Sequence, residues 1–185
     1  DIALAGNTLW AATTGGVVAW NLGDNSYKSY TTLDGLLSCD INQVAIDKKG
    51  RPLVVTKRPY GLFVYENHAW KQITVGGDDN EIADKIISGL EVDRFGNVWV
   101  YIRSHEWDWY PGKSPCLWRY VGQTWHKHEG VYGPLALDPQ KNLLAVDSVS
   151  VFYNNSAKAY QIKIVSFNGS EFVIKVFIKV FEKFF

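Results

Sequence analysis

The 185-residue sequence predicts an all-β fold built from about four copies of one antiparallel unit. Three observations lead to this prediction: one short phrase recurs, aromatic landmarks recur in step with it, and apolar residues alternate between the landmarks as they do in strands. The phrase reads DRFGNVW at 93–99, DKKGRPL at 47–53 and DPQKNLL at 138–144. Its spacing of 45 or 46 residues is typical of a repeat architecture.

Three further landmarks keep nearly the same period. They are the residue that opens the apolar run (Trp10, Leu53, Trp99, Leu144), an aromatic that ends a later run (Trp20, Tyr65, Tyr120, Phe167) and an aromatic that follows it (Tyr27, Trp70, Trp125, Phe172). The period indicates units near 1–38, 39–85, 86–131 and 132–172. We expect the four residues of the first set to occupy equivalent buried positions, where one unit packs on the next.

Each unit is expected to contain four strands. The inner strands are predicted at 41–47, 87–93 and 132–138, where apolar residues stand two apart. A turn follows, in which Gly50 or Gly96 can supply a positive φ. Further strands are expected near 52–56, 61–65, 98–102 and 116–120. Four antiparallel strands per repeat, with no helical segment between repeats, make one blade of a β-propeller.

The chain resembles the two-component regulator propeller family. Blades of that family run DGLPSN-x-V-x-x-I-x-x-D-x-x-G-x-LW-x-GT-x-x-G-L-x-x-Y, and this chain has DGLLSCDINQVAIDKKGRPLVVTKRPYGLFVYENHAW at 34–70 and TLWAATTGGVVAW at 8–20. The resemblance is good over 1–130 and weak over 131–172. Departures from the pattern are Cys39 in place of Asn, Pro52 in place of a strand residue, and Lys141 in place of Gly.

The resemblance implies a ligand-binding or sensing propeller that is periplasmic or extracellular and is often attached to a histidine kinase. Members usually have more than four blades, so a piece of a larger ring is an alternative to a closed four-bladed ring. The absence of Met predicts that the chain is a processed form or an excised piece.

The composition of the chain argues against some classes of function. The 19 basic and 19 acidic side chains cancel, so no affinity for nucleic acid is expected. No uncharged apolar run reaches the roughly 18 residues of a membrane span. Cys39 and Cys116 lie 77 residues apart, which fits no zinc or redox motif; two free thiols are favoured over one disulfide. No cofactor is expected.

Two unusual segments, 75–85 and 103–115, should lie side by side on one face of the propeller. Their aromatic rings could stack on a sugar or a peptide, and their carboxylates could accept hydrogen bonds. The predicted ligand- or partner-binding residues are Asp78, Asp79, Glu81, Arg103, His105, Glu106, Trp107, Asp108, Trp109 and Tyr110. The alternative is a solvent-covered loop whose aromatics pack on the blade. The ligand could be a small molecule, a glycan or a protein.

Metal and catalytic motifs are weaker. The acidic run at 78–81 does not follow the EF-hand spacing, and His126 and His128 stand on an outer strand where solvated polar residues are common. No nucleophile motif is present, and the inner strands show no evident acid–base pair, so no catalytic residue is predicted. A non-catalytic binding or sensing module is therefore favoured. The alternatives are an assembly propeller that docks onto other chains and, less favoured, a propeller-fold lyase or hydrolase.

The segment EFVIKVFIKVFEKFF at 171–185 departs from the repeat, and 173–185 is set apart from the blades as a tail. Its β-branched residues favour a strand, although Lys175, Lys179 and Lys183 would form a polar stripe on a helix. As a strand it could close the ring by pairing with the first unit, or it could pair with another chain and mediate self-association.

Overall fold

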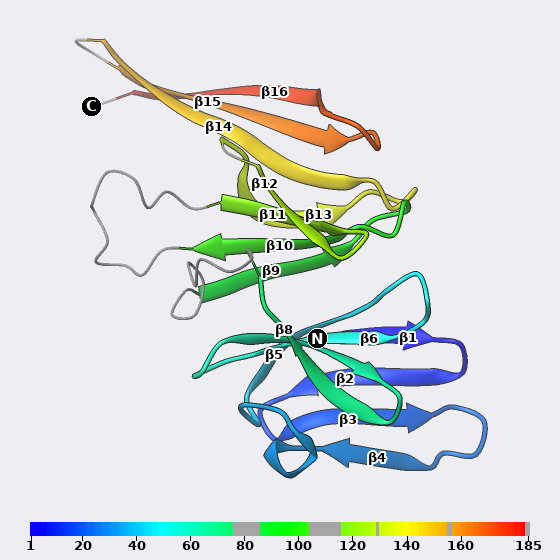
Figure 1. Ribbon diagram of the computed structural model, residues 1–185. Coiled ribbons are helices and arrows are strands. Elements are labelled where there is room, and N and C mark those ends of the chain that lie inside the picture. The colour runs from blue at the N-terminus through cyan, green and yellow to red at the C-terminus, as the bar shows by residue number, and fades with distance from the viewer. Residues whose placement is uncertain (76–85, 104–115, 129, 155–156, 184–185) are drawn as a thin grey trace.

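The computed structural model of the chain describes residues 1–75, 86–103, 116–128, 130–154 and 157–183 (Figure 1). Within these residues, sixteen strands form four antiparallel sheets of four strands each. The helical content of this part of the chain is one 3-10 turn, η1 (Thr32–Asp34). The predicted all-β class is therefore confirmed.

Each sheet is made of four consecutive strands, and we call it a blade. Blade 1 contains β1 (Ile2–Ala5), β2 (Thr8–Thr13), β3 (Gly16–Asn21) and β4 (Tyr27–Tyr30); blade 2 contains β5 (Ile41–Ile46), β6 (Pro52–Thr56), β7 (Gly61–Glu66) and β8 (Ala69–Ile73). Blade 3 contains β9 (Ile86–Val92), β10 (Val98–Arg103), β11 (Cys116–Val121) and β12 (Thr124–His128); blade 4 contains β13 (Tyr132–Leu137), β14 (Leu143–Asn154), β15 (Ala157–Phe167) and β16 (Phe172–Lys183). The seven strands predicted from the sequence agree with these bounds to within one residue.

Strands pair in chain order within each blade, so the first and fourth strands are the two edges. The first strands of successive blades contact one another, β1 with β5, β5 with β9 and β9 with β13, which places them on the inside of the arrangement. Figure 1 shows the blades following one another, with blade 1 at one end and blade 4 at the other. This is the architecture of a four-blade β-propeller.

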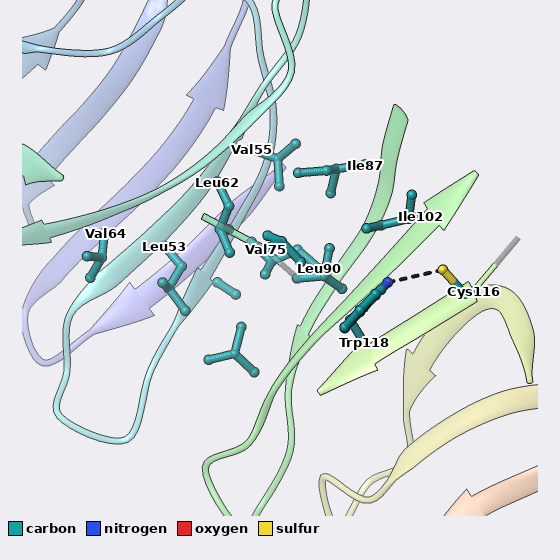
Figure 2. Packing of buried hydrophobic residues seen from close by; sticks show 13 residues of the cluster. Leu53, Val55, Leu62, Val64, Val75, Ile87, Leu90, Ile102, Cys116 and Trp118 are labelled. Carbon is teal, nitrogen blue, oxygen red and sulfur yellow. Dashed lines mark hydrogen bonds between the residues drawn. The ribbon is translucent and has the colours of Figure 1, made fainter. Parts of the chain in front are cut away.

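Apolar clusters fill the three spaces between successive blades. We call the side of a blade that is turned to the preceding blade its N-face, and the side turned to the following blade its C-face. Figure 2 shows the cluster between blades 2 and 3, where Leu53 and Leu62 on the C-face of blade 2 lie opposite Leu90 and Ile87 of blade 3. The core therefore consists of three layers between blades rather than one central mass.

The repeat landmark predicted to be buried follows this layering. Trp10, Leu53 and Trp99 are on the C-faces of blades 1, 2 and 3 and are 7%, 2% and 0% exposed. Leu144 is only half-buried, so its predicted burial is wrong. It occupies the same repeat position on the C-face of blade 4, which no further blade covers among the residues described. Leu143, next to it, is the fully buried residue, because it is on the N-face and packs on blade 3.

The recurring phrase is a hydrogen-bonded turn centred on an aspartate. In all three copies, Oδ1 of Asp47, Asp93 or Asp138 accepts hydrogen bonds from the backbone N–H groups two and four residues later, at 2.8–2.9 Å. In blade 3, Oδ2 of Asp93 also accepts from Asn97 Nδ2 and from Trp99 Nε1, both at 2.8 Å. The aspartate thus fixes the turn between the inner two strands and, in blade 3, ties it to the buried indole.

The segment that follows residue 171 is the fourth strand of blade 4. β16 pairs with β15 along its length, so the strand alternative is confirmed for 172–183. Cys39 and Cys116 are not joined by a disulfide; Cys39 is half-buried, and Cys116 lies in the cluster of Figure 2, where its Sγ accepts a hydrogen bond from Trp118 Nε1 at 3.1 Å.

Candidate functional site

The binding residues predicted from the sequence fall almost entirely outside the described residues. Arg103 is described: it ends β10 and is exposed. The others, which lie outside, are Asp78, Asp79, Glu81, His105, Glu106, Trp107, Asp108, Trp109 and Tyr110. The residues that flank the two segments do lie together, because Ile86 pairs with Arg103, and Ile102 pairs with both Ile87 and Cys116. The two segments therefore start from one end of blade 3, and their role in binding stays a prediction.

A second candidate site lies at the centre of the blades. A pocket of about 490 Å³ is lined by residues of the innermost strand of every blade, and we call it the axial pocket. Its lining residues are Asp1, Ile2, Ala3, Leu4, Asn42, Gln43, Val44, Ala45, Ile46, Leu90, Glu91, Val92, Leu137 and Lys141. Because each innermost strand is a sheet edge, its outer row of backbone N–H and C=O groups is not used within the blade. The pocket can therefore offer backbone donors and acceptors as well as side chains.

One carboxylate of the axial pocket is already committed to the fold. Asp1 Oδ1 accepts a hydrogen bond from Ile2 N, and Asp1 Oδ2 accepts one from Val44 N, both at 2.9 Å. The second bond crosses from blade 1 to the free edge of β5. Asp1 thus satisfies an edge N–H of the neighbouring blade, and its two oxygens are partly occupied before any ligand binds.

The second carboxylate, Glu91, breaks the repeat. Glu91 is on the C-face of β9, directly paired with Trp99; the corresponding positions in the other blades are Ala3, Ala45 and Ala136. Burial raises the pKa of the Glu91 carboxyl above its ordinary value, because burial removes hydration from the charged form. A charged side chain thus replaces a methyl group at one repeat position, and that position lines the axial pocket.

A second departure from the repeat faces the same pocket. Lys141 occupies the turn position that is Gly50 in blade 2 and Gly96 in blade 3, and all three residues have a positive φ, of 59°, 77° and 81°. A left-handed backbone costs a non-glycine residue about 1–2 kcal/mol. The turn is held in place because the Lys141 carbonyl accepts a hydrogen bond from Arg94 N at 2.8 Å. Blade 4 therefore keeps a strained lysine where glycine would fit, and this lysine lines the axial pocket.

The axial pocket was not among the sites predicted from the sequence. The starts of the inner strands show no acid–base pair, whereas Glu91 stands near the end of β9. The substitution of Gly by Lys141 was visible as a departure from the family pattern. The series Ala, Ala, Glu, Ala at one repeat position was the other available signal, and it becomes visible once the four copies are aligned strand by strand.

The two histidines considered as metal ligands have a different environment. His128 is half-buried between blades 3 and 4, with its ring 5.3 Å from that of Trp99 and 5.5 Å from that of Phe172. Burial lowers the pKa of His128, and the charges of Arg119 and His126 lower it further. Within the described part of the chain, no group of three or more His, Cys, Asp and Glu side chains is arranged to hold a metal ion.

Comparison with known proteins identifies the fold. No protein-family model and no curated protein matches the chain. Among solved structures, two of the extracellular domain of BT4673 from B. thetaiotaomicron each match 94% of the chain with a TM-score of 0.61 and 18% identity; one is described as part of a one component system and the other as part of a hybrid two component system. A protein described as a gluconolactonase matches 95% of the chain (TM-score 0.54, 13% identity), and virginiamycin B lyase from Staphylococcus aureus matches 94% (TM-score 0.52, 10% identity).

These similarities support the β-propeller fold. The chain spans 21% of the BT4673 domain, 73% of the gluconolactonase and 68% of the lyase. No helix among the described residues has the length and apolar character needed to cross a bilayer.

Proposed function

We propose that this chain is a non-catalytic ligand-binding module of an extracytoplasmic sensor and that its ligand binds in the axial pocket between Glu91 and Lys141. The ligand class that fits is a small polar molecule, or the polar end of a larger one. It would present a hydrogen-bond donor to the carboxyl group and an acceptor to the ammonium group, with the free strand edges supplying further partners.

One observation carries this proposal. Glu91 and Lys141 both break a repeat that the other blades keep, both do so at a cost in free energy, and both line one pocket. A half-buried carboxyl loses hydration, and a left-handed lysine is strained. Violations of local structural rules that gather at one place are expected at functional sites.

The fold comparison supports the sensing part of the proposal. The BT4673 domains are extracellular parts of signalling systems, and the chain has the same blade arrangement over 94% of its length. The same similarity supports an extracytoplasmic location. The chain spans about a fifth of those domains, so a signalling role of the whole protein is part of what we propose.

A propeller-fold hydrolase or lyase is the second candidate, and the raised pKa of Glu91 favours it, since a carboxyl with a raised pKa can serve as a general acid. Acid–base chemistry would also need a second group within reach of the substrate. Asp1 is the other carboxylate that lines the pocket, and it already accepts two backbone hydrogen bonds. We therefore favour binding over catalysis.

Isothermal calorimetry with three sets of probes tests the proposal: neutral oligosaccharides, acidic oligosaccharides and short peptides. We expect one set to bind the wild type. Glu91→Gln and Lys141→Gly should each weaken that binding at least about tenfold, as the loss of a hydrogen bond to a charged group does. Lys141→Gly also restores the residue of the repeat, so it should leave the melting temperature unchanged or raised.

Lys49→Ser is the matched control, because Lys49 is an exposed lysine in the corresponding turn of blade 2 and does not line the axial pocket. Binding in this variant should equal that of the wild type. If both pocket variants bind normally, the axial site is wrong. Turnover of a bound probe, measured by product analysis and abolished in Glu91→Gln, would favour the enzyme instead.

A further inference from the structure

We propose that a groove between blades 2 and 3, at the end of the blades that carries the turns 47–51 and 93–97, is a second binding site and takes a small aromatic carboxylate. The aromatic ring would occupy the position that an indole occupies in the two neighbouring layers, and the carboxylate would pair with Lys48 and Lys49. The groove shares no lining residue with the axial pocket, so its ligand is independent of the one proposed there.

The groove has the size and the apolar walls of a small-molecule site. Its volume is about 520 Å³, within the range of pockets that hold small ligands. Leu53, Val64 and Ile73 line it from the C-face of blade 2, and Val98 and Tyr120 line it from the N-face of blade 3. Leu53 and Val64 are directly paired across β6 and β7 and lie next to each other in Figure 2. A flat apolar group would therefore have apolar side chains on both sides.

The layers on either side of this one each contain an indole from the preceding blade. The ring of Trp10 in blade 1 lies 5.7 Å from that of Tyr65 and 6.2 Å from that of Trp70, the two aromatic landmarks of blade 2. In the same way, the ring of Trp99 in blade 3 lies 4.9 Å and 5.6 Å from the corresponding two rings of blade 4. Each of these layers thus places one ring of the preceding blade against two rings of the following blade.

The layer between blades 2 and 3 keeps the two rings and lacks the third. Tyr120 and Trp125 of blade 3 lie 4.8 Å apart, and among the described residues Trp125 is the one aromatic ring that contacts Tyr120. The repeat position of the indole is held in blade 2 by Leu53, which is smaller and has no ring to stack. Leu53 and Tyr120 both line the groove. A ligand with a planar aromatic ring would therefore complete the layer in the way that its neighbours are completed.

The turn of blade 2 departs from the repeat a second time, at Arg51, where blades 3 and 4 have Asn97 and Asn142. The Arg51 guanidinium donates to Asp47 Oδ2 from Nε at 2.8 Å, and to Glu66 Oε1 at 2.6 Å. Asp47 and Glu66 are the two carboxylates among the residues that line the groove. Because Arg51 pairs with both, neither carboxylate is left uncompensated to repel an anion.

Two lysines give the groove a net positive charge. Lys48 and Lys49 line it, and neither forms an ion pair within the part of the chain that the structure describes. The stem of Lys48 lies against Gly96 of blade 3, so closely that a Cβ on Gly96 would overlap Lys48 Cδ. Lys48 therefore reaches from the turn of blade 2 to the turn of blade 3 at the edge of the groove. A carboxylate bound beside the ring would receive charge-assisted hydrogen bonds from these ammonium groups.

NMR titrations of the protein with benzoate and indole-3-carboxylate test the proposal, and the wild type should bind both. Benzamide keeps the ring and lacks the charge, so it should bind at least about tenfold more weakly than benzoate. Cyclohexanecarboxylate keeps the charge and lacks the flat ring, so it should bind about 2–10 times more weakly.

Two variants locate the site. Leu53→Trp introduces the residue that blades 1 and 3 have at this position, so its indole should fill the groove and abolish benzoate binding. The double variant Lys48→Gln with Lys49→Gln changes two exposed side chains, so it should fold normally, and it should weaken benzoate binding at least about tenfold. It decides the question if Leu53→Trp does not fold. Lys141→Gly is the matched control, because it removes a lysine from the axial pocket instead, and it should bind benzoate as the wild type does.

A wild type that binds neither benzoate nor indole-3-carboxylate overturns the proposal. So does benzoate binding that survives in folded Leu53→Trp or in the double lysine variant, or binding that is lost in Lys141→Gly, because the probe would then be bound elsewhere. If benzamide or cyclohexanecarboxylate binds as tightly as benzoate, the charge or the ring is not recognised, and the assigned ligand class is wrong.

Discussion

Replacing Trp99 by Ala tests whether the layers between blades hold the propeller together. Trp99 is 0% exposed, and its ring lies 4.9 Å from that of Phe167 and 5.6 Å from that of Phe172, both in blade 4. Its Nε1 donates to Asp93 Oδ2 at 2.8 Å, which also ties it to the turn of its own blade. The substitution therefore removes a contact between two blades and a hydrogen bond within one.

The expected cost is about 4–5 kcal/mol. Truncation of a buried Trp to Ala costs roughly 3–5 kcal/mol. Two further losses favour the upper half of that range. Each aromatic contact of Trp99 is worth about 0.5–1.5 kcal/mol beyond burial, and the substitution also removes the hydrogen bond to the buried carboxylate of Asp93. Trp99→Phe keeps a ring but loses the indole N–H, so it should cost less, about 1–2 kcal/mol. A loss of 4–5 kcal/mol should lower the melting temperature by about 10–15 °C.

Urea unfolding followed by circular dichroism measures these values, with Leu144→Ala as the control at the same repeat position. Leu144 is half-buried and no described residue of a further blade covers it, so its truncation should cost about 1 kcal/mol. If Trp99→Ala costs less than about 1 kcal/mol, or no more than Leu144→Ala, the layer between blades 3 and 4 does not carry the stability assigned to it.

Two further predictions follow from other parts of the molecule. Burial lowers the pKa of His128, so the folded state favours its neutral form. The contribution of His128 to the free energy of unfolding should be fully present above its unfolded pKa of about 6.5 and should decrease as the pH falls below that value. Urea titrations at several pH values should show a smaller decrease in His128→Gln than in the wild type. If the segments predicted from sequence bind the ligand instead of the axial pocket, replacing both Trp107 and Trp109 by Ala should abolish probe binding in calorimetry, while Glu91→Gln leaves it unchanged. The melting temperature of the double variant should stay within a few degrees of the wild type; its unfolding would instead show that these aromatics pack on the blade.

The repeat made most of the fold predictable. Its period gave the number of blades, and the alternation of apolar residues gave strand bounds to within one residue, since a strand has one side-chain period and the turns between strands are marked by Asp and Gly. The phrase around Asp93 was readable as a turn. Its hydrogen bond to Trp99 was not, because a bond between side chains depends on rotamers that a pattern of residue types does not specify.

Leu144 shows that a repeat does not by itself predict burial. A repeat predicts which face a residue is on, and Leu144 is on the predicted C-face. Burial depends in addition on whether another blade covers that face, and this is a property of neighbours rather than of the residue. The same limitation hid the exposure of Tyr27, whose repeat equivalent Trp70 is buried. In a repeat protein the sequence of one copy therefore predicts the face of a residue, whereas its burial also requires the neighbouring copy that packs on that face.

The candidate site was hard to predict for a related reason. The predicted binding residues lie in long insertions, because extra residues in a compact fold are conspicuous. Glu91 and Lys141 add no residues; they replace an alanine and a glycine within the regular pattern, and they are 50 positions apart in the chain. The propeller brings them together because β9 and β13 are neighbouring inner strands around one pocket. In a propeller, the location of a residue is given by its position within the repeat and by the blade to which it belongs. Two substitutions that break the repeat in adjacent blades, at positions next to the axis, are therefore a stronger indication of a binding site than the length of any one loop.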